Sequence, residues 1–183
     1  MKVASASAIT IVLYTALLFV CLAFLGSIVW SIIYSVKTKN KNGIYAVLFS
    51  LLSIALAAFS WITNLGWIRF ILTILLIPFV HALAFGTMNV CASKYVNCSK
   101  TMKVSVWLFY ITYLCTYIFL PDSGDHGPMY MFFGLVRSNS VANIAYYVSM
   151  GAFMMHIATF IVQIVQISDY KKKMKLINVN ELK

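Results

Sequence analysis

Two histidines lie within long hydrophobic stretches of the sequence, where an ionisable side chain is costly to keep. His81 lies about midway along Trp67–Ala92, and His156 lies about midway along Ala142–Ile167. If both stretches are helices that cross a membrane in the same direction, a rise of about 1.5 Å per residue brings both imidazoles near the bilayer centre. This predicts either one shared midplane site for a small ligand or ion, or two separate residues that each fix the register of neighbouring helices.

Other polar side chains share the face or the depth of these histidines. In 142–167, small and polar residues recur at spacings of three and four, which predicts one continuous face that points away from lipid. Thr112 and Tyr113 reach the same depth on an antiparallel helix. The candidate ligand-binding residues are therefore His81, His156, Tyr113, Thr112, Thr159, Gln163 and Ser149.

Pro78 comes three residues before His81. Proline lacks a backbone N–H group and leaves the carbonyl of Ile74 without its helical partner. We therefore expect a kink in this helix, with Pro78 as the hinge.

Small residues also define helix-packing faces, because small side chains let two helix backbones approach closely within lipid. The second hydrophobic stretch carries such a face, and Ala145 and Ala152 belong to the polar face of 142–167. The candidate packing residues of the second stretch are Ala46, Ser50, Ser53, Ala57 and Ser60. These faces pack either against helices of the same chain or against a partner.

The composition explains which elements carry these residues. The chain is 62% hydrophobic and 10% charged, too apolar for a water-soluble domain of 183 residues. We predict an all-α membrane bundle that forms a single domain over residues 1–183. Its five transmembrane helices are expected at about Ala8–Val36, Ile44–Ile62, Trp67–Ala92, Val104–Leu120 and Ala142–Ile167.

The lysines predict how this bundle is oriented. With five spans, every basic residue except Lys2, Arg69 and Arg137 falls on one side, which the positive-inside rule places in the cytoplasm. The N-terminus is then outside, and residues 168–183 form a short basic cytoplasmic tail. We expect Lys171, Lys172, Lys173 and Lys175 of this tail to rest on anionic lipid headgroups.

Three connections carry local signals. Asn42–Gly43 predicts a turn between the first two helices. The apolar octet Met129–Val136 is expected either to lie on the membrane surface or to dip partly into the membrane, capping the bundle. Arg69 is expected to reach the membrane interface or to pair with Asp122 or Asp125.

The sequence lacks the motifs of common enzymes. It contains no HExxH, no P-loop and no dinucleotide fingerprint, and none of its four acidic residues lies in a predicted span. Asp122, Asp125 and His126 are interpreted as a polar turn rather than a metal site, and the four cysteines as reduced thiols. We therefore expect no catalytic activity, no metal or other cofactor and no nucleic-acid partner.

Three functions remain in competition. The first is transport or binding of a small ligand or ion at the midplane site. The second is a non-catalytic accessory, regulatory or immunity-type subunit that associates through its helices with a membrane protein or a second copy of itself. The third is a b-type haem protein with His81 and His156 as axial ligands. The abundance of Ile, Lys and Asn favours a bacterial plasma membrane as its location.

Overall fold

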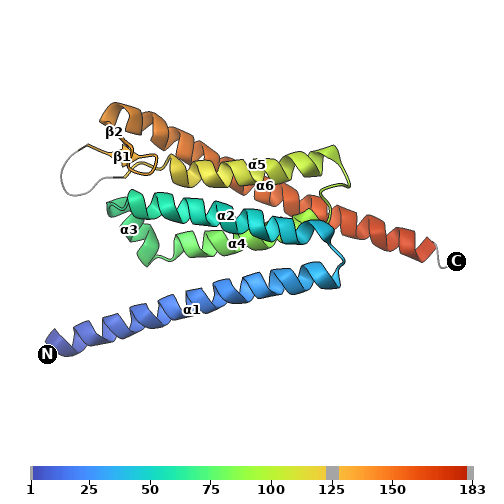
Figure 1. Cartoon of the computed structure of the whole chain (residues 1–183), viewed down its shortest axis with the longest axis horizontal. Coiled ribbons are helices and arrows are strands. Elements are labelled where there is room, and N and C mark those ends of the chain that lie inside the picture. Colours follow the sequence, from blue (N-terminus) through green and yellow to red (C-terminus); the bar gives the residue numbers. More distant parts are fainter. Residues whose placement is uncertain (1, 123–127, 181–183) are drawn as a thin grey trace.

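The computed structural model describes residues 2–122 and 128–180, leaving out the side chains of most residues before Leu22, of Lys175 and of 177–180. It confirms an all-α fold, to which one short β-hairpin is added (Figure 1). The elements in chain order are α1 (Lys2–Lys37), α2 (Lys41–Thr63), α3 (Trp67–Ile74), α4 (Ile77–Ser93), α5 (Lys100–Ile118), β1 (Tyr130–Met131), β2 (Val136–Arg137) and α6 (Asn139–Asn180).

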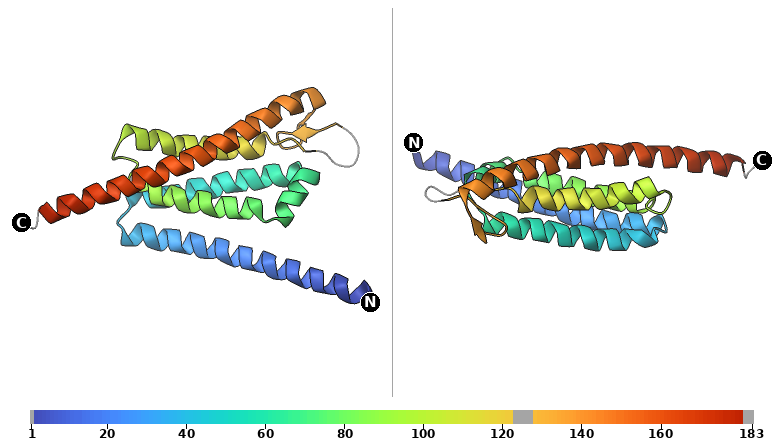
Figure 2. Two further views of the ribbon diagram at one scale, coloured as in Figure 1. Left: turned by 180° about the vertical axis from the view of Figure 1, so that it is seen from behind. Right: turned by 90° about the horizontal axis from the view of Figure 1, so that it is seen from above.

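Helices α2, α4, α5 and α6 run side by side and form the bundle, with α5 packed along α6 and α2 packed against α4 and α5 (Figures 1 and 2). Helix α1 contacts α2 and α4 near its C-terminal end and diverges from them toward its N-terminus. Among the described side chains of α1, Ser31 and Ser35 are buried, whereas Leu18, Phe19 and Leu22 are exposed. Helix α1 is therefore packed against the bundle only near its C-terminal end.

Among the residues that the structure describes, two helices are long and apolar enough to cross a membrane, namely α2 and the portion Asn139–Met174 of α6, and the described portion Leu22–Lys37 of α1 is a shorter apolar helix. The pair α3 and α4 passes the same test as a third span if the two helices are counted together. Helix α5, which was expected to be the fourth span, does not pass, because it carries Lys100, Lys103 and many hydroxyl side chains. The low hydropathy of α5 fits its position between α2 and α6. Four of its hydroxyl-bearing residues are buried against other helices, namely Thr112, Tyr113, Thr116 and Tyr117.

The stretch 67–92 is not one kinked helix. Helices α3 and α4 meet at 70°, and Leu76 between them adopts a left-handed conformation with φ of 58°. Pro78 lies in the first turn of α4, where its missing N–H group breaks no helical hydrogen bond. The chain therefore breaks two residues before Pro78 and starts a new helix there.

The connections also differ from expectation. The turn after α1 lies at residues 38–40, where Lys39 has φ of 50°, and Gly43 lies inside α2 against Ser35. Residues 130–137, which include most of the octet, form the hairpin β1–β2, in which Met131 is buried against Ala142 and Ala145 of α6. Helix α6 continues to Asn180, so the described part of the expected tail is an extension of the last helix.

Arg69 does not reach the interface. It is fully buried, and its guanidinium donates hydrogen bonds to the carbonyl oxygens of Ser60, Tyr117 and Leu120. The Asp122 carboxylate accepts hydrogen bonds from the backbone N–H groups of Gly66, Ile68 and Arg69, so it caps the start of α3. Asp125, the other predicted partner, lies outside the described residues. These bonds join α2, α3 and α5 at one end of the bundle.

Candidate functional site

The rings of His81 on α4 and His156 on α6 lie in contact. Their centroids are 4.7 Å apart and their planes are inclined by 78°, an edge-to-face arrangement. His81 Nδ1 lies 2.8 Å from the Tyr117 hydroxyl, and His156 Nδ1 lies 3.1 Å from Thr112 Oγ1. We call these two residues the histidine pair. Each is linked to α5 by a hydrogen bond, so α4 and α6 meet at the pair through a common neighbour.

Aromatic rings surround the histidine pair. Phe109 stacks on His156 with centroids 4.0 Å apart, and Phe85 stacks on Tyr113 at 3.8 Å. Tyr113 lies 5.1 Å from His81, and Phe153 lies 5.9 Å from it. Such contacts exclude water and hold each imidazole in one orientation. The sequence predicted a shared midplane ligand site here, whereas the structure has closely packed aromatic rings around the histidine pair.

The polar face of α6 packs on α5. The Ser149 hydroxyl donates to the Thr116 carbonyl at 2.8 Å, and the Gln163 side-chain amide donates to the Ser105 carbonyl at 3.1 Å. The Thr159 hydroxyl donates to carbonyls of its own helix. Ala145 is buried and Ala152 is partly buried on the same face. These residues share the interface between α5 and α6.

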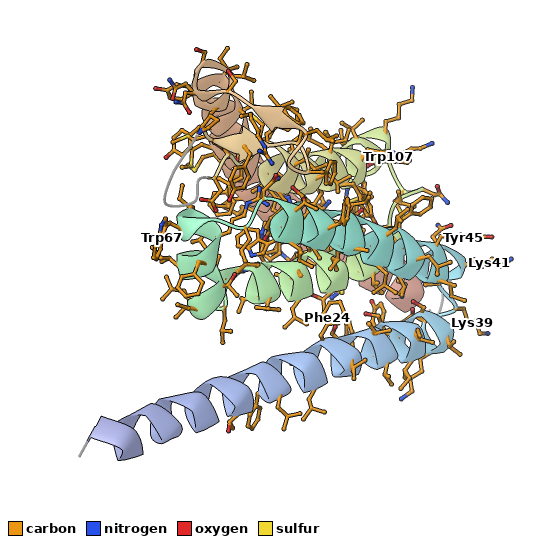
Figure 3. All side chains as sticks on the ribbon, turned by 60° about the vertical axis from the view of Figure 1, so that its left-hand side comes forward. Phe24, Lys39, Lys41, Tyr45, Trp67 and Trp107 are labelled. Atoms are coloured by element: carbon orange, nitrogen blue, oxygen red, sulfur yellow. The ribbon has the colours of Figure 1, made fainter. Side chains whose placement is uncertain are left out.

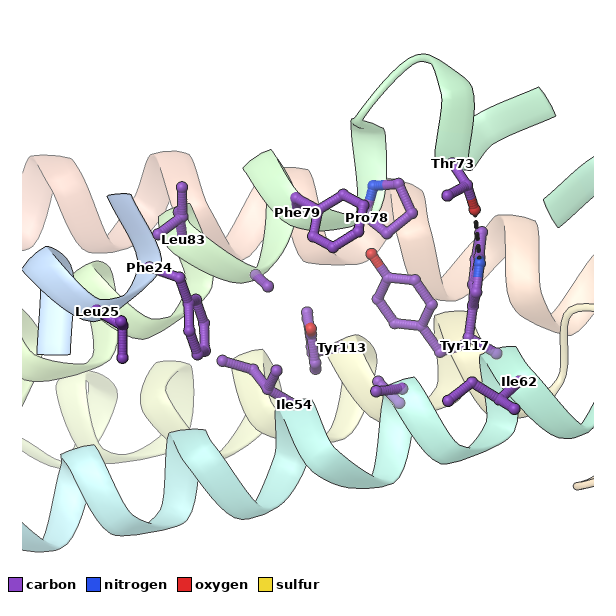
Figure 4. A pocket seen from close by; sticks show the side chains of 14 residues that line it. Phe24, Leu25, Ile54, Ile62, Thr73, Pro78, Phe79, Leu83, Tyr113 and Tyr117 are labelled. Atoms are coloured by element: carbon purple, nitrogen blue, oxygen red, sulfur yellow. Dashed lines mark hydrogen bonds between the residues drawn. The ribbon is translucent and has the colours of Figure 1, made fainter. Parts of the chain in front are cut away.

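An apolar cavity of about 530 Å³ is lined mainly by residues of α1, α2 and α4, with contributions from α3 and α5 (Figure 4). Of the residues singled out from the sequence, Tyr113, Ala57 and Pro78 line it. Tyr117, Trp61 and Thr73 also line it and were missed by the sequence analysis. Tyr113 and Tyr117 are four residues apart on one helix, a spacing that could have shown that both face the same way.

The cavity and the histidine pair are neighbours. Tyr117 lines the cavity, and its hydroxyl also forms a hydrogen bond with His81, so one phenol group contacts both sites. Figure 3 shows Phe24 in the space between α1 and the rest of the bundle, while Trp67 and Trp107 point outward. An apolar molecule in the cavity would therefore contact Tyr117, whose hydroxyl is bonded to the histidine pair.

The small face of α2 is covered by helices of the same chain. Ala46, Ser50, Ser53, Ala57 and Ser60 are all buried. The Ser50 hydroxyl lies 3.2 Å from the Tyr110 hydroxyl, and the Ser60 hydroxyl donates to the Tyr117 carbonyl at 3.0 Å. This face therefore packs within the chain.

The predicted lipid-facing lysines lie on the part of α6 that extends beyond the bundle (Figure 2). Lys171, Lys172 and Lys173 are exposed. The side chain of Lys175 lies outside the described residues. The helix presents these charges beyond its hydrophobic portion.

The contact between the two imidazoles argues against the haem alternative. Axial ligation requires the two rings on opposite faces of a porphyrin, with the iron between them. Here the rings touch each other and Phe109 covers His156. Within the part of the chain that the structure describes, no group of three or more His, Cys, Asp or Glu could hold a metal ion. His126 lies outside that part.

Comparison with protein-family models, curated proteins and solved structures finds no match to this chain.

Proposed function

We propose that this chain is a multi-pass membrane protein, without catalytic chemistry of its own, that binds or transports a small ligand at mid-depth in the bilayer. The observation that carries the proposal is the hydrogen bond between Tyr117 and His81, which joins an apolar cavity to the histidine pair. Ligand sites are mostly apolar cavities of about 300–1,000 Å³ with a few placed polar groups, and this cavity has that size and character.

The proposed topology has five spans, an external N-terminus and a cytoplasmic C-terminus, in a bacterial plasma membrane. The distribution of lysines supports it, as does the apolar exterior of the bundle, where Leu22, Phe49 and Ile161 are exposed. Helices α3 and α4 together form the third span, and α5 forms the fourth as a largely covered helix.

The alternative of an accessory subunit depended on small-residue faces that are free to meet a partner. The faces of α2 and α6 instead pack within the chain, where Ser60 and Ser149 bond to carbonyls of α5. This leaves the ligand-binding function with the stronger structural support.

Native mass spectrometry of the protein purified in mild detergent tests ligand binding. We expect the wild-type chain to carry a small molecule that is not a phospholipid, and both His81→Phe and Tyr117→Phe to lose it. Thr87→Val is the matched control, because it removes a hydroxyl of α4 that bonds to carbonyls of its own helix. A wild-type protein without such a molecule, or variants that retain it, would contradict the proposal.

Labelling of single cysteines in intact cells tests the topology. In a background without the four native cysteines, we expect Leu135→Cys to react with a membrane-impermeant maleimide and Lys173→Cys to react only after permeabilisation. The reverse pattern would overturn the proposed orientation.

A further inference from the structure

The lining of the cavity is uncharged. Its fourteen residues include no Lys, Arg, Asp, Glu or His (Figure 4). The Trp61 indole N–H donates to the Thr73 hydroxyl at 2.9 Å, and that hydroxyl donates to the Arg69 carbonyl at 2.7 Å. Because these polar groups already bond to one another, an ion or a strongly hydrated solute would lose its water in the cavity without replacement.

Tyr117 supplies a polar end to this apolar space. A phenol has one donor and two acceptor sites, and one of these sites is used by His81 Nδ1 at 2.8 Å. A neutral imidazole carries its proton on either nitrogen, and His81 Nε2 is buried without a hydrogen-bond partner among the described residues. Tyr117 can therefore donate its proton to His81 and accept from a ligand, or accept from His81 and donate to a ligand. Both a hydroxyl and a carbonyl group suit such a partner.

The cavity reaches the outer surface of the bundle beside α1. Two of its lining residues, Leu25 on α1 and Ile62 on α2, are 59% and 73% exposed. Helix α1 diverges from α2 and α4 on this side (Figure 1). In a chain that spans the bilayer, an opening between apolar helices at this position faces acyl chains rather than water.

We infer that the cavity binds an uncharged lipophile that carries one hydroxyl or carbonyl group and enters from the bilayer between α1 and the pair α2–α4. The polar group of this molecule bonds to the Tyr117 hydroxyl, and the hydrocarbon part of the molecule contacts Phe24, Ile54 and Phe79. The inference rests on the proposed function and adds the class of ligand and its route of entry.

Photoaffinity labelling of the wild-type protein in phosphatidylcholine nanodiscs tests the ligand class. Three probes carry the same diazirine on the same chain: a fatty alcohol, a fatty acid and a phosphatidylcholine. We expect the alcohol to label α1, α2 and α4 at the cavity, and the acid to label them at least about tenfold less, because its carboxylate finds no partner there. Equal labelling by all three probes would show a space filled by any acyl chain and would overturn the inference.

A matched pair of alanines on α2 tests the location. Ala58 lines the cavity, whereas Ala55 is exposed on the same helix and does not line it. We expect Ala58→Phe to reduce labelling by the alcohol about tenfold and Ala55→Phe to leave it unchanged. Because both alanines are exposed, neither substitution places a ring in the core. Equal effects of the two variants would overturn the inference.

Tyr117→Phe tests the polar end, and we expect it to reduce labelling by the alcohol about fivefold to tenfold. If Tyr117→Phe leaves labelling at the cavity unchanged, the inference is overturned.

The outcomes also separate this inference from the proposed function. If the alcohol fails to label while the purified protein still carries a molecule that His81→Phe removes, the ligand class is wrong and the proposed function stands. If the alcohol labels as expected but His81→Phe leaves every bound molecule in place, the failure lies in the histidine pair and not in the cavity.

Discussion

The hydroxyl of Tyr117 lies 2.8 Å from Nδ1 of His81, and this bond connects a phenol that lines the apolar cavity with an imidazole that contacts His156. A single residue of α5 therefore lines the cavity that can receive a ligand and is also bonded to the histidine pair beside it. The energetic consequences of this bond can be measured without knowledge of the ligand.

Removal of the Tyr117 hydroxyl should destabilise the protein. In Tyr117→Phe, both ring nitrogens of His81 lack a partner among the described residues, and a buried unsatisfied group costs roughly 1–3 kcal/mol. Chemical unfolding in detergent measures this loss. The double variant His81→Phe/Tyr117→Phe is the control, because it removes both groups and should be less destabilised than the sum of the single variants. Strictly additive effects would show that the bond contributes no coupling.

Arg69→Met should destabilise the protein by about 3 kcal/mol or more, because it leaves buried carbonyl oxygens of Ser60 and Tyr117 without their charged donor. Arg69→Lys should recover only part of this loss, since one ammonium group does not reproduce the planar fork of a guanidinium. Thermal unfolding compares these variants with Arg137→Met, which changes an exposed arginine of β2. An Arg69→Met variant as stable as Arg137→Met would refute this role.

The sequence predicted which helix faces are buried better than it predicted where helices break. Regular spacings of small residues indicated the buried faces, as with Ser53 on α2 and Ser149 on α6. The break at Leu76 could not be predicted, because a left-handed leucine is unfavourable locally and is held by the surrounding structure. Pro78 signalled an irregularity, but proline suits the first turn of a new helix as well as a kink.

The candidate site was also only partly predictable. Depth along the predicted spans brought His81 and His156 to one level, and the structure has the two rings in contact. The cavity could not be predicted, since it depends on how far α1 diverges from α2 and α4, and no residue pattern encodes that separation. Tyr117 escaped notice because tyrosine is common near membrane interfaces, where it needs no special role.

Gly43→Ala should weaken the attachment of α1. A Cβ atom at Gly43 would overlap the hydroxyl of Ser35 and lie 2.6 Å from its Cβ, so α1 and α2 would have to separate. We expect a loss of about 1–3 kcal/mol in unfolding experiments. Gly26→Ala is the matched control within α1, because nothing lies within 4 Å of its added Cβ, and it should stabilise the helix by about 0.5–1 kcal/mol. Equal behaviour of the two variants would mean that α1 is not held through Gly43.

The lysines of α6 should select anionic lipid. Lys171, Lys172 and Lys173 follow Ile167 within two helical turns, so in the proposed topology they stand at the level of the cytoplasmic headgroups. Each contributes about 1 kcal/mol of attraction to an anionic surface at low salt. In native mass spectrometry, the triple Lys→Gln variant should therefore lose most of its preference for phosphatidylglycerol over phosphatidylcholine. The triple Lys→Arg variant, which keeps the charge, should retain the preference. In the wild type and in the Lys→Arg variant, the preference for phosphatidylglycerol should weaken as the salt concentration is raised. A Lys→Gln variant with unchanged lipid selection would show that this segment of α6 does not lie on the membrane surface.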